Sequence, residues 1–295
     1  MDDDPAGMEG MNAISIEEAR AILGDRDLIS VGARGDEERR RRHGRKTTFV
    51  RVMEVHVDAV PAALPASASA GEIRITGKPA SVAAAVAAVK AARTLGGPTP
   101  VTAFSLADLL ELAGGSLASL TDLAARLGAA GLATIADAPI DVLLDPVAAV
   151  GAAREGGLHV PRLTVHHVRG DDRIRLVTLA RDVQAGVGGV HAFAPLARVN
   201  SVAQPSTGYD DVKQIAVARL LADNIDSIQV DWALYGPKLA QVALTVGADD
   251  VDAVSPLEGD LGRRRSPIEE IRGNITAAGL EPFERDALFR MTNAE

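Results

Sequence analysis

Segments rich in β-forming residues alternate with segments rich in helix-forming residues along most of this 295-residue chain. Residues 72–76, for example, alternate between polar and apolar side chains as a strand does. Eight strand candidates span residues 48–57, 72–76, 100–104, 132–135, 161–165, 189–194, 228–234 and 251–254. Because strands that alternate with helices normally pair in parallel, the pattern predicts an α/β fold, specifically a TIM-type (β/α)8 barrel. An open doubly wound sheet is the alternative.

Two helices are predicted before the first strand. Ser15 and Glu18 have the spacing of a capping box, which marks the start of a helix, and a second helix is expected over 34–42. Residues 1–12 carry no such signal, and we expect them to form a disordered tail. The connections that follow are short, so residues 13–295 are expected to form a single barrel domain with N-terminal helices.

The charge of the chain argues against several classes of partner. Acidic residues outnumber basic ones by 40 to 31, and a chain with a net charge of -9 is a poor binder of nucleic acid. The basic segment 39–46 could dock an anion or a partner, but we favour a solvated helix face. No stretch approaches the roughly 18 apolar residues of a membrane span, and the acidic N-terminus does not resemble a secretory signal. We therefore expect a cytoplasmic protein that binds neither nucleic acid nor membrane.

The most specific motifs lie in the last third of the chain. They are Ser-Thr-Gly-Tyr-Asp-Asp-Val at 206–212, Trp232, Gly-Pro-Lys at 236–238, Gly-Ala-Asp-Asp-Val-Asp at 247–252 and Ala-Gly-Leu-Glu-Pro-Phe-Glu-Arg-Asp at 278–286. Together they resemble aminofutalosine synthase, a radical S-adenosylmethionine enzyme of the futalosine route to menaquinone. Dehypoxanthine futalosine cyclase and the deazaflavin-cofactor synthase share these motifs more loosely. The resemblance implies an α/β barrel, in agreement with the strand count.

The chain departs from this family where the family's chemistry takes place. Family members carry a C-x3-C-x2-C loop after the first strand, and its thiolates hold a [4Fe–4S] cluster that binds S-adenosylmethionine. This chain contains no cysteine, and a gapless register from Phe49 places Pro61, Pro65 and Ala68 at the three positions. A family glutamate expected near the cofactor falls at Arg169. The resemblance therefore predicts a protein without the cluster, for which S-adenosylmethionine is not an expected cofactor.

Polar residues near the predicted strand ends are candidates for lining a pocket, because barrel active sites lie at the carboxyl ends of the strands. The candidates are His56, Asp58, His167, Arg169, His191 and Asp231. His166 and His167 would need a third converging ligand to hold a metal ion, so no metal is expected and no residue is assigned as catalytic.

Three carboxylates lie close together at the start of the last predicted strand. Asp249, Asp250 and Asp252 could include an acid–base pair, but such a cluster more often caps a strand or pairs with a neighbouring arginine.

Three functions are compatible with these observations. We favour a pseudoenzyme, a partner or regulator that acts beside a futalosine-pathway enzyme or associates with a second copy of itself. An enzyme with different, non-radical chemistry on a nucleoside-like or carboxylated small molecule is the first alternative, since folds readily host new reactions. A carrier or sensor that binds such a ligand without turnover is the second.

Overall fold

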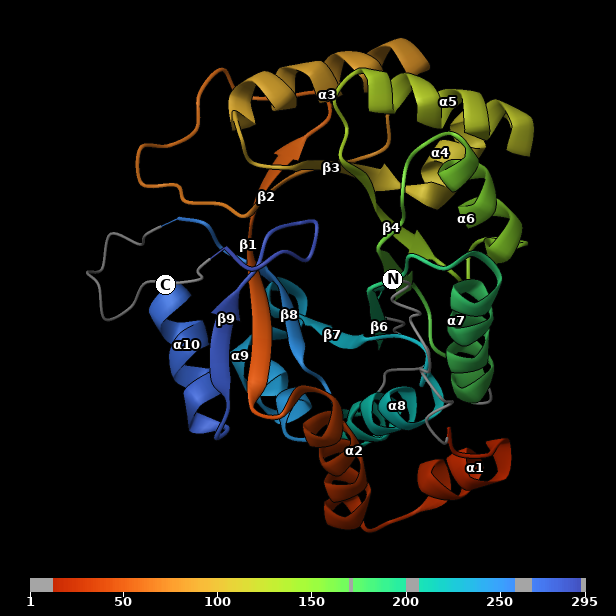
Figure 1. Cartoon of the computed structure of the whole chain (residues 1–295), viewed down its shortest axis with the longest axis vertical. Helices are drawn as coiled ribbons and strands as arrows, with labels where there is room; N and C mark the ends of the chain where they lie inside the picture. The colour runs from red at the N-terminus through yellow and green to blue at the C-terminus, as the bar shows by residue number, and fades with distance from the viewer. Residues whose placement is uncertain (1–12, 170–171, 200–206, 258–266, 293–295) are drawn as a thin grey trace, which may run out of the picture.

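The computed structural model describes residues 13–169, 172–199, 207–257 and 267–292. Its centre is a closed barrel of eight parallel strands, and each strand pairs with the next until β8 pairs with β1 (Figure 1). The strands are β1 (Lys46–His56), β2 (Glu72–Thr76), β3 (Val101–Ser105), β4 (Thr134–Pro139), β5 (Arg162–Val165), β6 (Ala192–Ala197), β7 (Ser227–Asp231) and β8 (Asp250–Val254). The predicted barrel is confirmed, and the open sheet is wrong because β8 closes onto β1.

Helices surround the barrel (Figure 1). They are α3 (Val82–Gly96), α4 (Leu106–Leu112), α5 (Leu117–Ala129), α6 (Pro146–Glu155), α7 (Arg173–Val187), α8 (Gly208–Leu221), α9 (Trp232–Leu244) and α10 (Pro267–Ala277). The predicted strand 228–234 ends early, because Asp231 accepts a hydrogen bond from the Leu234 amide and caps α9. Trp232 therefore begins a helix and does not lie within a strand. The short helix α4 was not predicted.

A ninth strand, β9 (Glu281–Glu284), was also not predicted. It pairs with the amino half of β1, at Lys46–Phe49, while β2 pairs with the carboxyl half, at Val52–His56. One edge of the long strand β1 thus pairs with both β9 and β2. Beyond β9 the chain turns across the amino end of the barrel, where the Ala287 amide donates to the Gly71 carbonyl.

Two helices precede the barrel, α1 (Ile16–Gly24) and α2 (Leu28–His43). The predicted capping box at Ser15 is confirmed, since its hydroxyl accepts from the Glu18 amide and the Glu18 carboxylate accepts from the Ser15 amide. Residues 1–12, the expected tail, lie outside the described residues.

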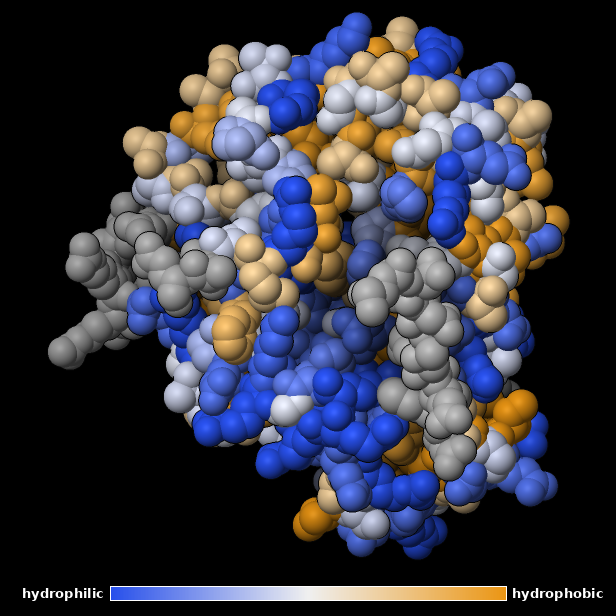
Figure 2. Space-filling model, in the orientation of Figure 1, coloured by the Kyte–Doolittle hydropathy of each residue, from blue (hydrophilic) through white to orange (hydrophobic). Residues whose placement is uncertain are grey.

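The basic part of α2 is only partly a solvated face. Arg39 is fully buried and Arg42 nearly so, and they donate to backbone carbonyls at Gly44, Asp223 and Ile225. The favoured interpretation of a solvated face is therefore wrong for these two arginines. The lower part of the molecule, where Figure 1 places α2, is strongly hydrophilic on the face shown in Figure 2.

Apolar side chains fill the space between the barrel and its helices, and most of them are alanine, valine, leucine and isoleucine. Within the described part of the chain, no helix combines the length and apolar character needed to cross a membrane.

Close contact between α2 and its neighbours depends on Gly35. A Cβ atom at this position would overlap the Val246 carbonyl oxygen and press on the Cα atom of Ala216 in α8. We therefore expect Gly35→Ala to lower the free energy of unfolding by about 1–3 kcal/mol, measured by urea denaturation, because overpacking forces the helices apart.

Gly273→Ala in α10 is the matched control. A Cβ atom there meets open space, so the substitution should leave stability unchanged or raise it by up to about 1 kcal/mol through helix propensity. Equal losses for the two variants would contradict the packing argument.

Candidate functional site

The barrel interior contains a set of paired charges, which we call the interior ion-pair network: Glu72, Arg74, Arg162 and Asp252. Arg74 donates two hydrogen bonds to the Asp252 carboxylate, at 2.8 and 3.0 Å, and a third to Glu72 at 2.6 Å. Arg162 donates to the same Asp252 carboxylate and to the Ala136 carbonyl. All four charged side chains are buried. The network joins β2, β5 and β8, three strands that are not neighbours in the barrel.

The other two carboxylates of the Gly-Ala-Asp-Asp-Val-Asp motif are also paired with arginines. Asp250 accepts hydrogen bonds from Nε and Nη2 of Arg285, each at 2.6 Å, and Asp249 pairs with Arg219. The expectation that these aspartates pair with neighbouring arginines is confirmed.

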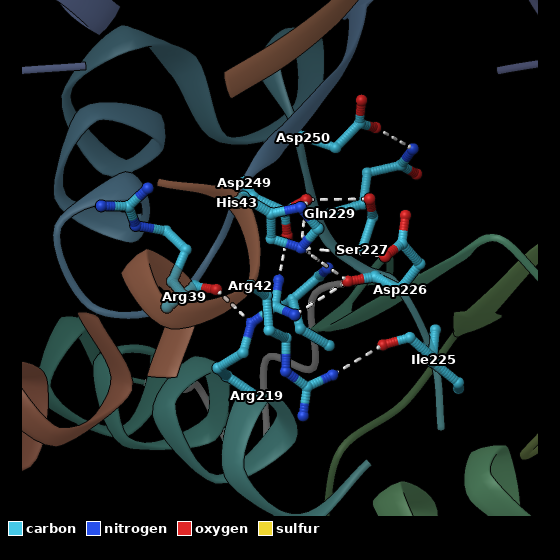
Figure 3. A network of polar contacts seen from close by, with 12 residues as sticks. Arg39, Arg42, His43, Arg219, Ile225, Asp226, Ser227, Gln229, Asp249 and Asp250 are labelled. Carbon is cyan, nitrogen blue, oxygen red and sulfur yellow. Dashed lines mark hydrogen bonds and ion pairs between the residues drawn. The ribbon is translucent and has the colours of Figure 1, made fainter. Parts of the chain in front are cut away.

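Asp249 is the centre of a wider set of contacts at the amino end of the barrel (Figure 3). It accepts hydrogen bonds from the Ser227 hydroxyl and the Ile228 amide, each at 2.8 Å, and His43 Nε2 lies 3.5 Å from its carboxylate. These contacts join α2, α8, β7 and the start of β8, so the role of this aspartate is structural.

The charges in the interior ion-pair network stabilise one another. Burial alone raises the pKa of the Asp252 carboxyl, but the guanidinium groups of Arg162 and Arg74 outweigh it and hold that pKa well below its usual range. The space left between these side chains is about 10 Å³, enough for roughly one water molecule. Thr134 and Gln229 line this space, and Thr134 Oγ1 and Gln229 Oε1 have no hydrogen-bond partner among the described residues. This layer of the barrel is filled and offers no room for a substrate.

At the carboxyl end of the barrel, the pocket candidates lie on separate strands. His56 and Asp58 are exposed after β1, with His56 Nδ1 3.7 Å from an Asp58 carboxylate oxygen. His167 and Arg169 are exposed after β5. Asp231 is buried at the end of β7, where Arg198 binds it at 2.9 Å. These five candidates lie at the end of the barrel where active sites form. Their role in lining a pocket stays a prediction.

His191 lies at the opposite end. It directly precedes β6, and its ring stacks on Phe289 of the C-terminal segment at 5.0 Å. It therefore does not converge with His56 or His167, and the structure does not gather the six candidates into one pocket. The predicted strand at 189–194 began too early, which placed His191 inside it.

The loop that takes the place of the family's cysteine loop follows β1. Pro61 and Pro65 are exposed, and Ala68 is half-buried, where it forms a β-bridge with Leu257. None of these side chains has an atom that can bind iron, and no group of three or more His, Cys, Asp or Glu residues able to hold a metal occurs in the described part of the chain. The residues present do not fit a [4Fe–4S] cluster.

The sequence interpretation missed a groove beside α4, because that helix was not predicted. Ser105 ends β3 and its hydroxyl caps α4, which places Asp108 in the first turn. Asp108 lines the groove together with His166, which follows β5. Burial raises the pKa of Asp108; Lys78 opposes this effect, and Asp137 and Glu111 add to it. The groove could have been predicted from a helix start at Ser105, directly after the third strand.

Comparison with known protein families supports the resemblance in the C-terminal part. Residues 190–294 match the family described as CofH/MqnC C-terminal region. This range includes β6 to β9 and the three aspartates that pair with buried arginines.

Curated relatives match over part of their length. The aminodeoxyfutalosine synthase of Thermus thermophilus is 36% identical over 135 residues, which cover 41% of this chain and 36% of the relative. The 5-amino-6-(D-ribitylamino)uracil–L-tyrosine 4-hydroxyphenyl transferase of Methanococcoides burtonii is 33% identical over 138 residues, covering 41% and 39%. The chain thus spans about two fifths of the length of the curated relatives it matches.

Solved structures share the fold. Methylornithine synthase superposes with a TM-score of 0.62 at 14% identity, covering 92% of this chain and 94% of the other. The hydrogenase maturase HydG superposes with a TM-score of 0.64 at 14% identity, covering 92% and 72%. At such low identity these matches concern the barrel architecture alone.

The interior ion-pair network should make stability depend on Asp252. We expect Asp252→Asn to lower the free energy of unfolding by about 3–5 kcal/mol at neutral pH, because Arg74 and Arg162 lose a buried counter-charge. The pKa of Asp252 is lower in the folded than in the unfolded chain, so its contribution is complete above about pH 5 and is lost as pH falls. The gap between wild type and variant should therefore narrow on acidification, as urea denaturation at several pH values would measure.

Asp172→Asn is the control for this prediction. Its ion pair with Arg175 is largely exposed, so its loss should change stability by less than about 1 kcal/mol. A gap between wild type and Asp252→Asn that stays constant or widens toward acid pH would show that the carboxylate does not stabilise the barrel in this way.

Proposed function

Because this chain is a relative of the CofH/MqnC family of radical S-adenosylmethionine proteins, we propose that it is a non-radical member of that group, acting as a partner or regulator of an enzyme of the family. The observation that carries the proposal is the loop after β1, where Pro61, Pro65 and Ala68 occupy the positions of the three cluster ligands. Proline and alanine side chains cannot replace thiolates, and the chain has no cysteine elsewhere to take their place.

Retention of the rest of the barrel supports a role in recognition. The described barrel is closed, and the aspartates of β8 and the residue before it are paired with arginines. The match over residues 190–294 includes these aspartates and their arginine partners Arg219 and Arg285. A chain that keeps the scaffold of a family while it loses the ligands of the reactive centre can still present the family's outer surface to a partner.

Menaquinone biosynthesis is the proposed context. Two curated relatives are named aminodeoxyfutalosine synthase, from Thermus thermophilus and from Streptomyces coelicolor, and their activity is a property of those proteins. In this proposal the chain carries neither cluster nor S-adenosylmethionine, and it alters the activity or the stability of a cluster-bearing relative from the same cell.

The first test is anaerobic reconstitution with iron and sulfide. We expect the wild-type chain to bind no cluster, as judged by visible absorbance and EPR, and to form no 5′-deoxyadenosine from S-adenosylmethionine, because no thiolate is present. The triple variant Pro61→Cys, Pro65→Cys, Ala68→Cys restores the C-x3-C-x2-C spacing and serves as the positive case for cluster binding.

A second triple variant controls for the mere presence of thiols. Ala63→Cys, Ala66→Cys and Ser67→Cys place three cysteines in the same loop at a different spacing, and they should bind less cluster than the matched spacing does. A cluster on the wild-type chain would refute the proposal that it is non-radical.

The partner role is tested separately, by adding the chain to a purified cluster-bearing CofH/MqnC-type enzyme from the same organism. We expect a stoichiometric complex in analytical ultracentrifugation and a change in that enzyme's turnover or half-life. An unrelated TIM barrel of similar size and charge is the control. The partner role would be overturned if the chain, like the control barrel at the same concentration, formed no complex and left the activity unchanged.

A further inference from the structure

The described surface includes a groove at the carboxyl end of the barrel that neither the interior network nor the cysteine-loop position uses. We propose that this groove binds a small apolar amine, with the ammonium group paired to Asp108 and the apolar part lying against the β4–α6 loop. We call it the α4 groove; its main lining residues are Asp108, Leu110, Glu111, Val142, Leu144 and His166. Its volume of about 690 Å³ lies within the usual range for small-molecule sites.

Asp108 is the carboxylate in this region that lacks a partner. Among the described residues, Glu111 is paired with Lys78 at 2.5 Å, and Asp137 accepts a hydrogen bond from Thr164 at 2.9 Å. Asp141 accepts the backbone amides of both residues that follow β5, each at 2.8 Å. Asp108 has neither a hydrogen bond nor an ion pair within the described chain, although it is half-buried. An unpaired, partly desolvated carboxylate is the complement of a cation.

Other charged groups near Asp108 determine the sign of the net charge in the groove. Asp137 and Glu111 add negative charge, while Lys78 and His166 oppose it. Lys78 is already engaged by Glu111, and its ammonium group is exposed. With Asp108 itself, three carboxylates lie in this region beside one lysine that Glu111 already holds, an arrangement that favours an ammonium group over a carboxylate or phosphate ligand.

Apolar side chains form the other wall of the groove. Leu144 is fully exposed and Val142 is half-exposed, at 101% and 49% of their maximal surfaces. Both belong to the loop between β4 and α6, and both line the same groove as Asp108. An apolar wall beside a single unpaired charge fits an amphipathic amine better than a metal ion, which would need several converging ligands. In the described part of the chain no such set of ligands occurs.

The backbone holds Asp108 in place. Phe104, the residue before the Ser105 cap, has a φ of 61°, in the left-handed region that a bulky residue rarely adopts. This turn lets α4 begin directly at the end of β3 and projects its first turn over the carboxyl end of the barrel. Strained residues of this kind are common beside binding sites.

The experiment measures binding of 2-phenylethylamine to the full chain by NMR titration. Its matched probes are 2-phenylethanol, which has the same apolar part without the charge, and 3-phenylpropionate, which has the opposite charge. We expect saturable binding of the amine, with the alcohol and the carboxylate weaker by about tenfold or more, the usual effect of losing one charged contact. Asp108→Asn should lower the affinity for the amine by a similar factor and leave the affinity for the alcohol unchanged.

Asp122→Asn in α5 is the control variant, because Asp122 is an exposed carboxylate outside the groove. It should bind the amine as the wild type does, and thermal unfolding should show that both variants are folded. Absence of saturable amine binding, equal affinity for the alcohol, or an unchanged affinity in Asp108→Asn would each overturn the proposal. The inference rests on the α4 groove alone and does not depend on the protein having a partner.

Discussion

The contact on which the barrel depends most is that of Asp252 with Arg74 and Arg162. These residues come from β8, β2 and β5, so one carboxylate connects strands spread around the whole barrel. Each charge is buried and would be costly to leave alone, because desolvation of an unpaired ion costs several kcal/mol. The three residues therefore need one another, and their mutual geometry requires the strand register that the barrel adopts.

This arrangement also limits where function can lie. The interior ion-pair network leaves space for about one water molecule, and residues 285–292 cross the amino end of the barrel, where Arg285 packs over the Phe289 ring at 4.0 Å. The larger space for binding lies at the carboxyl end, because the cavity that remains at the amino end, between His43, His191 and Met291, has a volume of about 200 Å³, against about 690 Å³ for the α4 groove. At the carboxyl end the chain has both the loop after β1 and the α4 groove after β3, which can be tested separately.

Loss of the cysteine ligands and retention of the scaffold are physically compatible. The loop after β1 contacts the rest of the barrel through the bridge between Ala68 and Leu257, a hydrogen bond from the Ser69 amide to Pro256, and the side chains of Val60 and Leu64, which pack against the apolar core. Pro61 and Pro65, at two of the three ligand positions, are exposed. These two side chains can change without disturbing the paired charges in the interior. The aspartates of the 247–252 motif are different, because each one pairs with a buried arginine.

The sequence by itself determined the barrel, the capping box at Ser15 and the absence of cysteine, because strand periodicity, helix caps and residue identity are local properties. Only the tertiary structure decided that Asp249, Asp250 and Asp252 pair with Arg219, Arg285 and Arg74, since their partners lie 30 or more positions away along the chain. It also decided that His191 lies at the amino end and that Asp108, in the first turn of α4, has no ion pair among the described residues. Those placements depend on where each strand begins and ends in the closed sheet, a register that long-range pairing fixes and local pattern does not.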